Sequence, residues 1–167
     1  LERIDDQADL LVRNGLAGVF VCGTTGEGPS LTTAERKAVA ERWIQAAPEG
    51  FRVIVHVGHQ SFRDSCDLSR HAADRGAAAV ACMAPTFFRP RNAADLADYI
   101  VAVAAAAALP LYYYHIPSMT GVNIPVGELL ALAGPRAANL AGMKFTHTDV
   151  VDFAACLTLD EGRFDCL

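Results

Sequence analysis

The amino-acid sequence of 167 residues predicts an α/β fold in which short parallel strands alternate with helices. Two patterns predict this class. Apolar residues gather in short continuous runs instead of alternating with polar ones, which is typical of parallel strands covered on both faces. One such run and one helical segment recur about every 25 to 35 residues, the length of a single βα unit.

Six apolar runs are predicted to form strands, the last of them only as the beginning of a strand: Leu16–Cys22, Phe51–Val57, Ala78–Met83, Leu111–Tyr114, Leu140–Phe145 and Arg163–Leu167. Six helices are predicted before and between these strands: Ile4–Asn14, Thr32–Ala47, Ser61–Arg75, Asn92–Ala108, Pro125–Ala133 and Asp149–Leu157.

Residues typical of helix ends support these boundaries. Thr32 and Glu35 have the spacing of a capping box, in which each side chain accepts a hydrogen bond from a backbone N–H at the helix start. Gly76 stands where the third helix should end. Asn92 is the predicted cap of the fourth helix, and Pro125 is predicted in the first turn of the fifth.

Two architectures fit repeated βα units: a (β/α)₈ barrel and an open doubly wound sheet. Candidate functional residues decide between them, since they stand at the carboxyl ends of several strands: Gly23–Glu27, His56, Tyr114 and Lys144. A barrel gathers all its strand ends around one pocket, whereas an open sheet brings together mainly those beside its switch point. The sequence therefore favours the (β/α)₈, or TIM, barrel.

The predicted units are fewer than a closed barrel requires. Five complete βα units and the beginning of a sixth strand are predicted, against eight strands and typically about 250 residues. The chain also opens on the helix Ile4–Asn14, with no strand before it. We therefore expect residues 1–167 to form a single partial TIM-barrel domain that lacks the first strand and the last strands.

Composition narrows the classes of function. The formal net charge is −5 and no basic cluster is present, which argues against nucleic acid as a partner. Neither a signal peptide nor an apolar run of about 18 residues or more is visible, which argues against a membrane. The five cysteines are an odd number, and none lies in a Cys-x-x-Cys pattern. We therefore expect a cytoplasmic protein with reduced thiols.

Lys144 and Tyr114 are the sharpest candidates for chemistry, because each follows a short apolar run that is predicted to be a buried strand. A desolvated lysine has a lowered pKa, and its neutral amine can attack a carbonyl to form a Schiff base. A nearby phenol could move protons on the bound substrate. Each residue alone also has a structural interpretation: the lysine could pair with Asp149, and the tyrosine could simply pack in the core.

The segment Gly23–Gly28 lies between a predicted strand and a predicted helix, and offers the hydroxyls of Thr24 and Thr25 together with several backbone N–H groups to a carboxylate. It lacks the lysine of a phosphate loop and the dinucleotide-binding spacing. The alternative is a glycine-rich turn with a capping threonine.

Other polar and aromatic residues point less clearly to a function. His56 and His59 do not make a metal site, since residues three apart on a strand face opposite sides and no third ligand is near. His115 and His147 are expected to line the pocket or cap a turn. The pair Phe87–Phe88 is expected in an apolar pocket wall or a subunit contact.

Three motifs together resemble the pyruvate-dependent class I aldolase family, which includes N-acetylneuraminate lyase and dihydrodipicolinate synthase. These are Gly23–Glu27, Tyr114–Pro117 with Thr120–Gly121, and Gly142–Thr146. The resemblance covers almost the whole chain. It implies a TIM barrel, a lysine Schiff base, no metal or organic cofactor, and usually a homotetramer.

The resemblance also implies roles for single residues. Lys144 would form the imine with a 2-keto acid, and Tyr114 would be the general acid and base. Thr24 and Thr25 would hold the pyruvate carboxylate, and Thr146 would line the sugar side of the pocket.

Two departures from the family pattern narrow the choice of substrate. Met119 stands where dihydrodipicolinate synthases carry an arginine, and Phe87 falls where they use a tyrosine. The segments His56–Gly58 and Lys144–Asp149 are instead similar to sialic acid lyases of the animal type, although their sugar-binding Gly-x-Asp-Glu segment is absent.

We therefore expect cleavage of N-acetylneuraminate to N-acetylmannosamine and pyruvate. The alternatives are another pyruvate-dependent aldolase, a 2-keto-3-deoxy sugar acid dehydratase, or a non-catalytic truncated domain.

Overall fold

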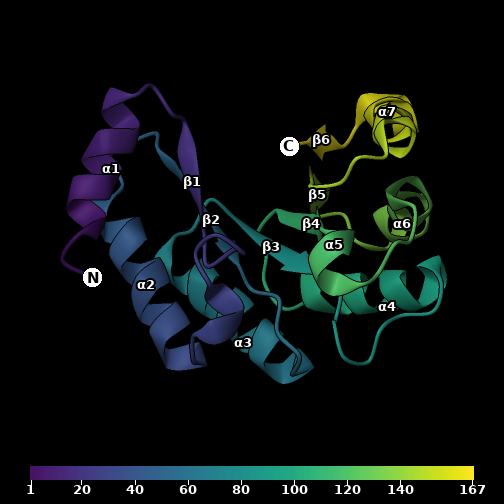
Figure 1. Ribbon diagram of the computed structural model, residues 1–167, viewed down its shortest axis with the longest axis horizontal. Coiled ribbons are helices and arrows are strands. Elements are labelled where there is room, and N and C mark those ends of the chain that lie inside the picture. Colours follow the sequence, from purple (N-terminus) through teal and green to yellow (C-terminus); the bar gives the residue numbers. More distant parts are fainter.

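Six parallel strands form one sheet, and strands that are neighbours in the sheet are also neighbours in the chain. The computed structural model describes residues 1–167, and Figure 1 shows the course of the chain. Every neighbouring pair of strands is parallel. The strands are β1 (Gly18–Val21), β2 (Arg52–His56), β3 (Ala79–Met83), β4 (Leu111–His115), β5 (Leu140–Phe145) and β6 (Asp165–Cys166).

Helices precede the sheet and connect its strands. The α-helices are α1 (Ile4–Arg13), α2 (Thr33–Ala46), α3 (Phe62–Arg75), α4 (Ala93–Ala104), α5 (Pro117–Thr120), α6 (Val126–Ala133) and α7 (Val150–Thr158). The 3₁₀-helices are η1 (Gly28–Ser30), η2 (Gly134–Arg136) and η3 (Leu159–Gly162).

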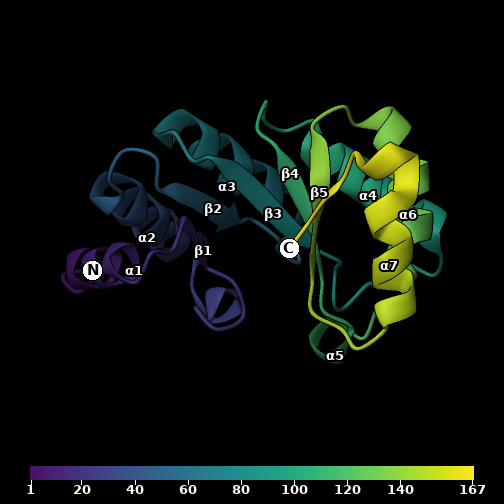
Figure 2. The same ribbon diagram turned by 90° about the horizontal axis from the view of Figure 1, so that it is seen from above.

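The arrangement of helices and strands is that of a barrel wall. In Figure 2 the longer helices follow one another along an arc outside the sheet, and none of them lies on its concave side. A doubly wound sheet would reverse its strand order at a switch point, whereas the order here runs from β1 to β6 without reversal. The structure is therefore a half-barrel, which confirms the barrel class that the sequence predicts.

The hydrophobic core lies between the outer face of the sheet and the helices. Alternate strand residues face opposite sides, so Val53 and Val55 of β2 are buried in this core while Ile54 faces a cavity on the inner side. A separate small cluster forms on the inner face from Met83, Tyr114 and Ile116, with Phe20 packed against it. The large apolar core thus leaves the inner face free for polar groups. The largest apolar side chains that are fully buried include Leu96, Ile100, Leu111, Leu129, Leu130 and Leu140.

Most of the predicted helix ends are confirmed. The capping box is present at α2, where the Thr32 side chain accepts from the Glu35 N–H and the Glu35 carboxylate accepts from the Thr32 N–H. The Asn92 side chain accepts from a backbone N–H in the first turn of α4. Gly76 ends α3 with a φ of 87°, in the left-handed region that favours glycine.

The predicted start of α6 is wrong by one residue. Pro125 was expected in the first turn, but it is the residue before the helix, which begins at Val126. The free N–H groups of Val126 and Gly127 donate to the carboxylate of Asp152, at 2.7 and 3.1 Å. Because Asp152 belongs to α7, this cap comes from another helix and leaves no local sequence signal.

The alanine-rich helix α4 ends at Ala104, four residues earlier than predicted. The side-chain amide of Asn139 donates to the carbonyls of Ala104, Ala107 and Leu109, at 3.0, 3.2 and 2.9 Å. These carbonyls are therefore satisfied in a turn. A distant side chain overrides the helix preference of the alanine run.

The sixth strand is shorter than predicted, because β6 covers only Asp165–Cys166. Its ladder to β5 continues by one residue beyond the strand, since the Leu167 N–H donates to the Met143 carbonyl at 2.9 Å. The short helix α5 was not predicted.

None of the helices is both long and apolar enough to cross a membrane. All five cysteines are free thiols, and four of them are buried. Buried free cysteines pack as small hydrophobic side chains.

We predict that Gly142→Ala destabilises the half-barrel at its β5–β6 edge. A Cβ at this position would lie 1.8 Å from the backbone carbonyl oxygen of Asp165, so β6 would have to move away. The free energy of unfolding in urea should fall by about 1–3 kcal/mol, the usual cost of overpacking.

The matched control for this prediction is Gly127→Ala in α6, where the nearest atom to a new Cβ is 3.5 Å away. This control should be neutral or gain up to about 1 kcal/mol from the helix preference of alanine. Equal stability of the two variants would contradict the predicted clash.

Candidate active site

The register of β4 and β5 places Tyr114 directly beside Lys144. The Lys144 Nζ lies 4.1 Å from the centroid of the Tyr114 ring and 5.5 Å from that of the Phe20 ring. It also donates to the hydroxyl of Thr146 at 2.9 Å. An amine, a phenol and a hydroxyl therefore meet at the carboxyl ends of two neighbouring strands.

The burial that the sequence predicts for these two residues is confirmed only for Tyr114. Tyr114 is buried, with 4% of its surface exposed. Lys144 is only half-buried, because it lines a cavity on the inner face of the sheet. The desolvated lysine expected at a buried strand end is not present in this half-barrel.

The loop after β1 brings Thr24 to Tyr114. The Thr24 Oγ1 lies 3.2 Å from the Tyr114 hydroxyl, within hydrogen-bond distance. Thr25 is exposed, and its hydroxyl makes no hydrogen bond to the protein. Of the two threonines expected to hold a carboxylate, one therefore touches the phenol and the other is free to meet a ligand.

A close packing of backbone fixes the shape of this loop. The Gly28 N–H donates to the Gly23 carbonyl at 3.1 Å, which closes the loop on itself. A Cβ on Gly28 would lie only 1.9 Å from the Cys22 carbonyl oxygen, so only glycine fits there. Cys22 itself has a φ of 56°, an uncommon value for a residue with a side chain.

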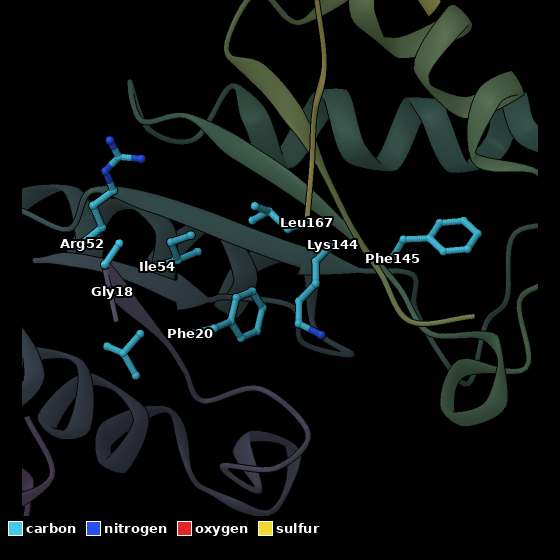
Figure 3. A pocket seen from close by; sticks show the side chains of 9 residues that line it. Gly18, Phe20, Arg52, Ile54, Lys144, Phe145 and Leu167 are labelled. Atoms are coloured by element: carbon cyan, nitrogen blue, oxygen red, sulfur yellow. The ribbon is translucent and has the colours of Figure 1, made fainter. Parts of the chain in front are cut away.

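A cavity of about 390 Å³ opens on the inner face of the sheet next to Lys144. Figure 3 shows the amine end of Lys144 near the Phe20 ring, with the Phe145 side chain directed the other way. The lining of this cavity is mainly apolar and does not include Thr24, Thr146 or Tyr114. Lys144 both lines the cavity and contacts the polar residues at the strand ends. The cavity is lined by Ala17, Gly18, Val19, Phe20, Arg52, Ile54, Lys144, Phe145 and Leu167.

His56 lies beside Tyr114 as a neutral ring. Its ring centroid is 5.8 Å from that of Tyr114, in an edge-to-face arrangement. Burial, together with the neighbouring charge of Arg36, lowers the pKa of His56 to about 3. The Nδ1 of this ring lies 3.1 Å from the Cys22 carbonyl, which a neutral imidazole can meet as a donor. His56 therefore ties the inner layer of side chains to the loop.

The histidines at 56 and 59 do not converge. His59 faces the start of α3, where its Nδ1 accepts from the Ser61 N–H at 3.0 Å. No group of three or more His, Cys, Asp or Glu side chains is placed to hold a metal ion.

His115 was expected to line the pocket or cap a turn, and its place in the structure is different. Because Tyr114 faces inward, His115 faces the outer side of the sheet, where its ring centroid lies 5.1 Å from Phe145 and 5.5 Å from His147. Burial, with the nearby His147, lowers the pKa of His115 to about 4.

Phe87 and Phe88 form no pocket wall. They are 79% and 86% exposed and contact each other edge-on at 4.9 Å. Their role in a subunit contact stays a prediction.

Sequence reasoning missed Arg36 in the first turns of α2. This side chain is 2% exposed and donates to the backbone carbonyls of His56 and Gly58 at the end of β2, at 2.6 and 3.0 Å. A signal was present, because Arg36, Ala40 and Trp43 have the spacing of one buried helix face and all three are buried.

Known proteins match this chain over almost its whole length. The model of the dihydrodipicolinate synthetase family matches residues 1–162. N-acetylneuraminate lyase of Rattus norvegicus is 43% identical over 163 residues, which is 96% of this chain and 51% of that protein.

Two solved structures have the same fold over almost the whole chain. N-acetylneuraminate lyase (sialic acid aldolase) of Aliivibrio salmonicida superposes with a TM-score of 0.95 at 42% identity, covering 99% of this chain and 55% of that chain. Dihydrodipicolinate synthase of Acinetobacter baumannii complexed with pyruvate gives a TM-score of 0.90 at 27% identity, covering 99% and 56%. This chain therefore spans about half the length of the relatives it matches.

We predict that His56 makes the protein less stable as the pH falls below about 6.5. An unfolded chain binds a proton on this histidine near pH 6.5, whereas the folded protein does so only near pH 3. The unfolded state is therefore favoured on acidification, by up to about 1.4 kcal/mol per pH unit for this one group. Urea unfolding between about pH 7 and pH 5 measures the slope before most carboxylates titrate.

His56→Asn should reduce this slope, and the rest should persist because His115 acts in the same direction. His59→Asn, three residues along the chain and half-buried, is the matched control for the loss of an imidazole. An unchanged slope in His56→Asn would contradict the buried neutral ring.

Proposed function

Because this chain belongs to the dihydrodipicolinate synthetase family, we propose that it carries the Schiff-base centre of a class I aldolase that cleaves N-acetylneuraminate to N-acetylmannosamine and pyruvate. The observation that carries the proposal is the contact of Lys144 with Tyr114, whose hydroxyl is in turn within reach of Thr24. These are the amine, the proton carrier and a carboxylate ligand that imine chemistry on a 2-keto acid requires.

The first half of the reaction forms the imine. Thr24 and Thr25 hold the substrate carboxylate, which brings the C2 ketone to Lys144 in attack geometry. After Lys144 loses a proton to solvent, its neutral amine adds to the ketone. Tyr114 then donates its phenolic proton to the resulting hydroxyl, and water leaves to give a protonated imine and a tyrosinate. This cation is the electron sink for the next step.

The second half breaks the C3–C4 bond. Tyr114 accepts the proton of the C4 hydroxyl, directly or through the substrate carboxylate, as the bonding electrons move into the iminium group. The C4 carbon becomes the aldehyde of N-acetylmannosamine, and an enamine of pyruvate remains on Lys144. Protonation at C3 and addition of water then release pyruvate and restore the amine.

The position of Met119 supports the choice of substrate within the family. Met119 lies in α5 and is 62% exposed, so position 119 itself offers no cation to a second carboxylate. This favours a sugar acid with one carboxylate over the substrate of a dihydrodipicolinate synthase. The names of the relatives from Rattus norvegicus and Aliivibrio salmonicida support the same choice.

Thr146 is assigned to the sugar side of the pocket. In the free protein its hydroxyl accepts a hydrogen bond from Lys144. Imine formation removes two of the three donors of the ammonium group, so Thr146 becomes available to a substrate hydroxyl.

Neither metal nor organic cofactor is part of the proposed reaction. A homotetramer and a cytoplasmic location are further parts of the proposal. The five free thiols support a reducing compartment.

We predict that sodium borohydride traps a reduced pyruvate adduct on Lys144. The chain has only two lysines, so the second one, Lys37, is an internal control for labelling; its amine is paired with Asp67 on the outer surface. Peptide mass spectrometry should find the adduct at Lys144 and not at Lys37, and Lys144→Ala should abolish it. An adduct that persists in Lys144→Ala would reject the assignment of this lysine, and absence of any adduct on folded protein would favour a non-catalytic domain.

We predict that Tyr114→Phe retains the pyruvate adduct but loses about 10²- to 10⁴-fold in cleavage of N-acetylneuraminate, the usual contribution of a positioned acid or base. Tyr113→Phe is the matched control, since it removes the same hydroxyl from the neighbouring residue, which packs in the outer core. The rate of pyruvate release measures the cleavage activity of both variants. Cleavage of 2-keto-3-deoxy sugar acids but not of N-acetylneuraminate would instead favour the alternative aldolase or dehydratase.

A further inference from the structure

Arg36 is a buried cation without an anionic partner. It is 2% exposed, and none of the ion pairs in the structure includes it. Its hydrogen bonds go to two neutral acceptors, the carbonyls of His56 and Gly58, and its Nε has no partner. Burying an uncompensated charge costs several kcal/mol, so its place in the fold calls for an explanation.

The titratable groups that face Arg36 do not cancel its charge. Burial raises the pKa of the Cys22 thiol, raises that of the Cys82 thiol to about 12, and raises that of the Tyr99 phenol. These three potential anions come from the β1 loop, β3 and α4, and all stay neutral near pH 7. His56 of β2 also stays neutral, and Lys144 beyond it adds a second positive charge.

Arg36 is connected to the loop that carries Thr24 and Thr25. The Cys22 thiol donates to the backbone carbonyl of Arg36 at 3.9 Å, and Cys22 directly precedes this loop. The Cys22 carbonyl lies 3.1 Å from the same His56 nitrogen that the guanidinium approaches. The charge is thus one layer of residues beneath the loop, on the side away from solvent.

We propose that Arg36 is a positioning residue whose uncompensated charge favours the carboxylate of a 2-keto acid at the Thr24–Thr25 loop. This inference rests on the proposed function, because it concerns the same ligand. Water screens a buried charge poorly, so its attraction reaches an anion one layer away. The competing explanation is that Arg36 only fastens α2 to the end of β2 through its two carbonyl hydrogen bonds.

The test compares a charged ketone with a neutral one. For each variant, the concentration giving half-maximal borohydride trapping is measured with pyruvate and with hydroxyacetone, which has no carboxylate. Arg36→Gln should raise the half-maximal concentration of pyruvate roughly tenfold, which is the size of a partly screened charge–charge interaction. The half-maximal concentration of hydroxyacetone should change by no more than about twofold. Arg36→Lys should restore most of the preference for pyruvate. Arg42→Gln, which removes a charge from an outer position of the same helix, should change neither ligand.

A second variant tests the charge while keeping the arginine. Cys22→Asp places a carboxylate where the thiol faces the guanidinium, and aspartate tolerates the positive φ of this position. Cys22→Asp should weaken the trapping of pyruvate as Arg36→Gln does. The uncharged Cys22→Asn shows how much trapping is lost through the change of side chain alone. The comparison of Cys22→Asp with Cys22→Asn tests the charge of Arg36 even if Arg36→Gln does not fold.

Equal weakening of both ketones, or equal behaviour of Cys22→Asp and Cys22→Asn, would overturn the proposal and leave Arg36 as a fastener. Calorimetric binding of pyruvate to Lys144→Ala, which cannot form the imine, separates this inference from the Schiff-base function. Arg36-dependent binding there, without any adduct in the unmodified chain, supports the charge role and rejects the aldolase. A chain that binds no pyruvate at all would overturn the inference.

Discussion

The parallel register between β4 and β5 is the constraint on which the candidate site depends. It pairs Tyr114 with Lys144, and strand side chains alternate between the two faces of the sheet. A shift of one residue would turn Tyr114 into the apolar core and bring His115 to the inner face. The register is held on one side by Leu111 and Met143, both fully buried beneath the helices. Packing on the outer face of the sheet therefore determines that Tyr114 and Lys144 lie side by side on the inner face.

The two faces of the sheet are stabilised by different interactions. The outer face is a continuous apolar core, and its burial supplies most of the free energy that favours folding. The carboxyl ends of the inner face instead hold a layer of buried polar groups, with Arg36 and His56 in contact beneath Tyr114. Such groups are costly to bury. Their hydrogen bonds to the carbonyls at the ends of β1 and β2 connect the loop after β1 to the sheet and thereby fix its shape.

Local patterns in the sequence predict the fold well and the site in part. The apolar runs and caps such as the Thr32–Glu35 box act over a few residues, so they can be read directly. The early end of α4 and the cap of α6 depend on Asn139 and Asp152 from elsewhere in the chain, and no local pattern predicts them. Arg36 was missed because an arginine on a helix is usually solvated, although its spacing with Ala40 and Trp43 marks the buried face. Lys144 and Tyr114 are predicted as site residues from their motifs, while the half-burial of Lys144 depends on what covers the inner face.

The proposed chemistry separates into two parts that lie in different places. Recognition of the keto acid involves the loop after β1 and the ends of β4 and β5, where Thr24, Tyr114 and Lys144 are already in contact. Recognition of the remainder of the substrate falls to rim positions such as Met119, which is exposed and contributes no charge. Imine formation needs only the first part, whereas the choice of sugar needs the second. A change at the rim can therefore alter the substrate without disturbing the amine, which explains how one Schiff-base centre can serve aldolases with different partners.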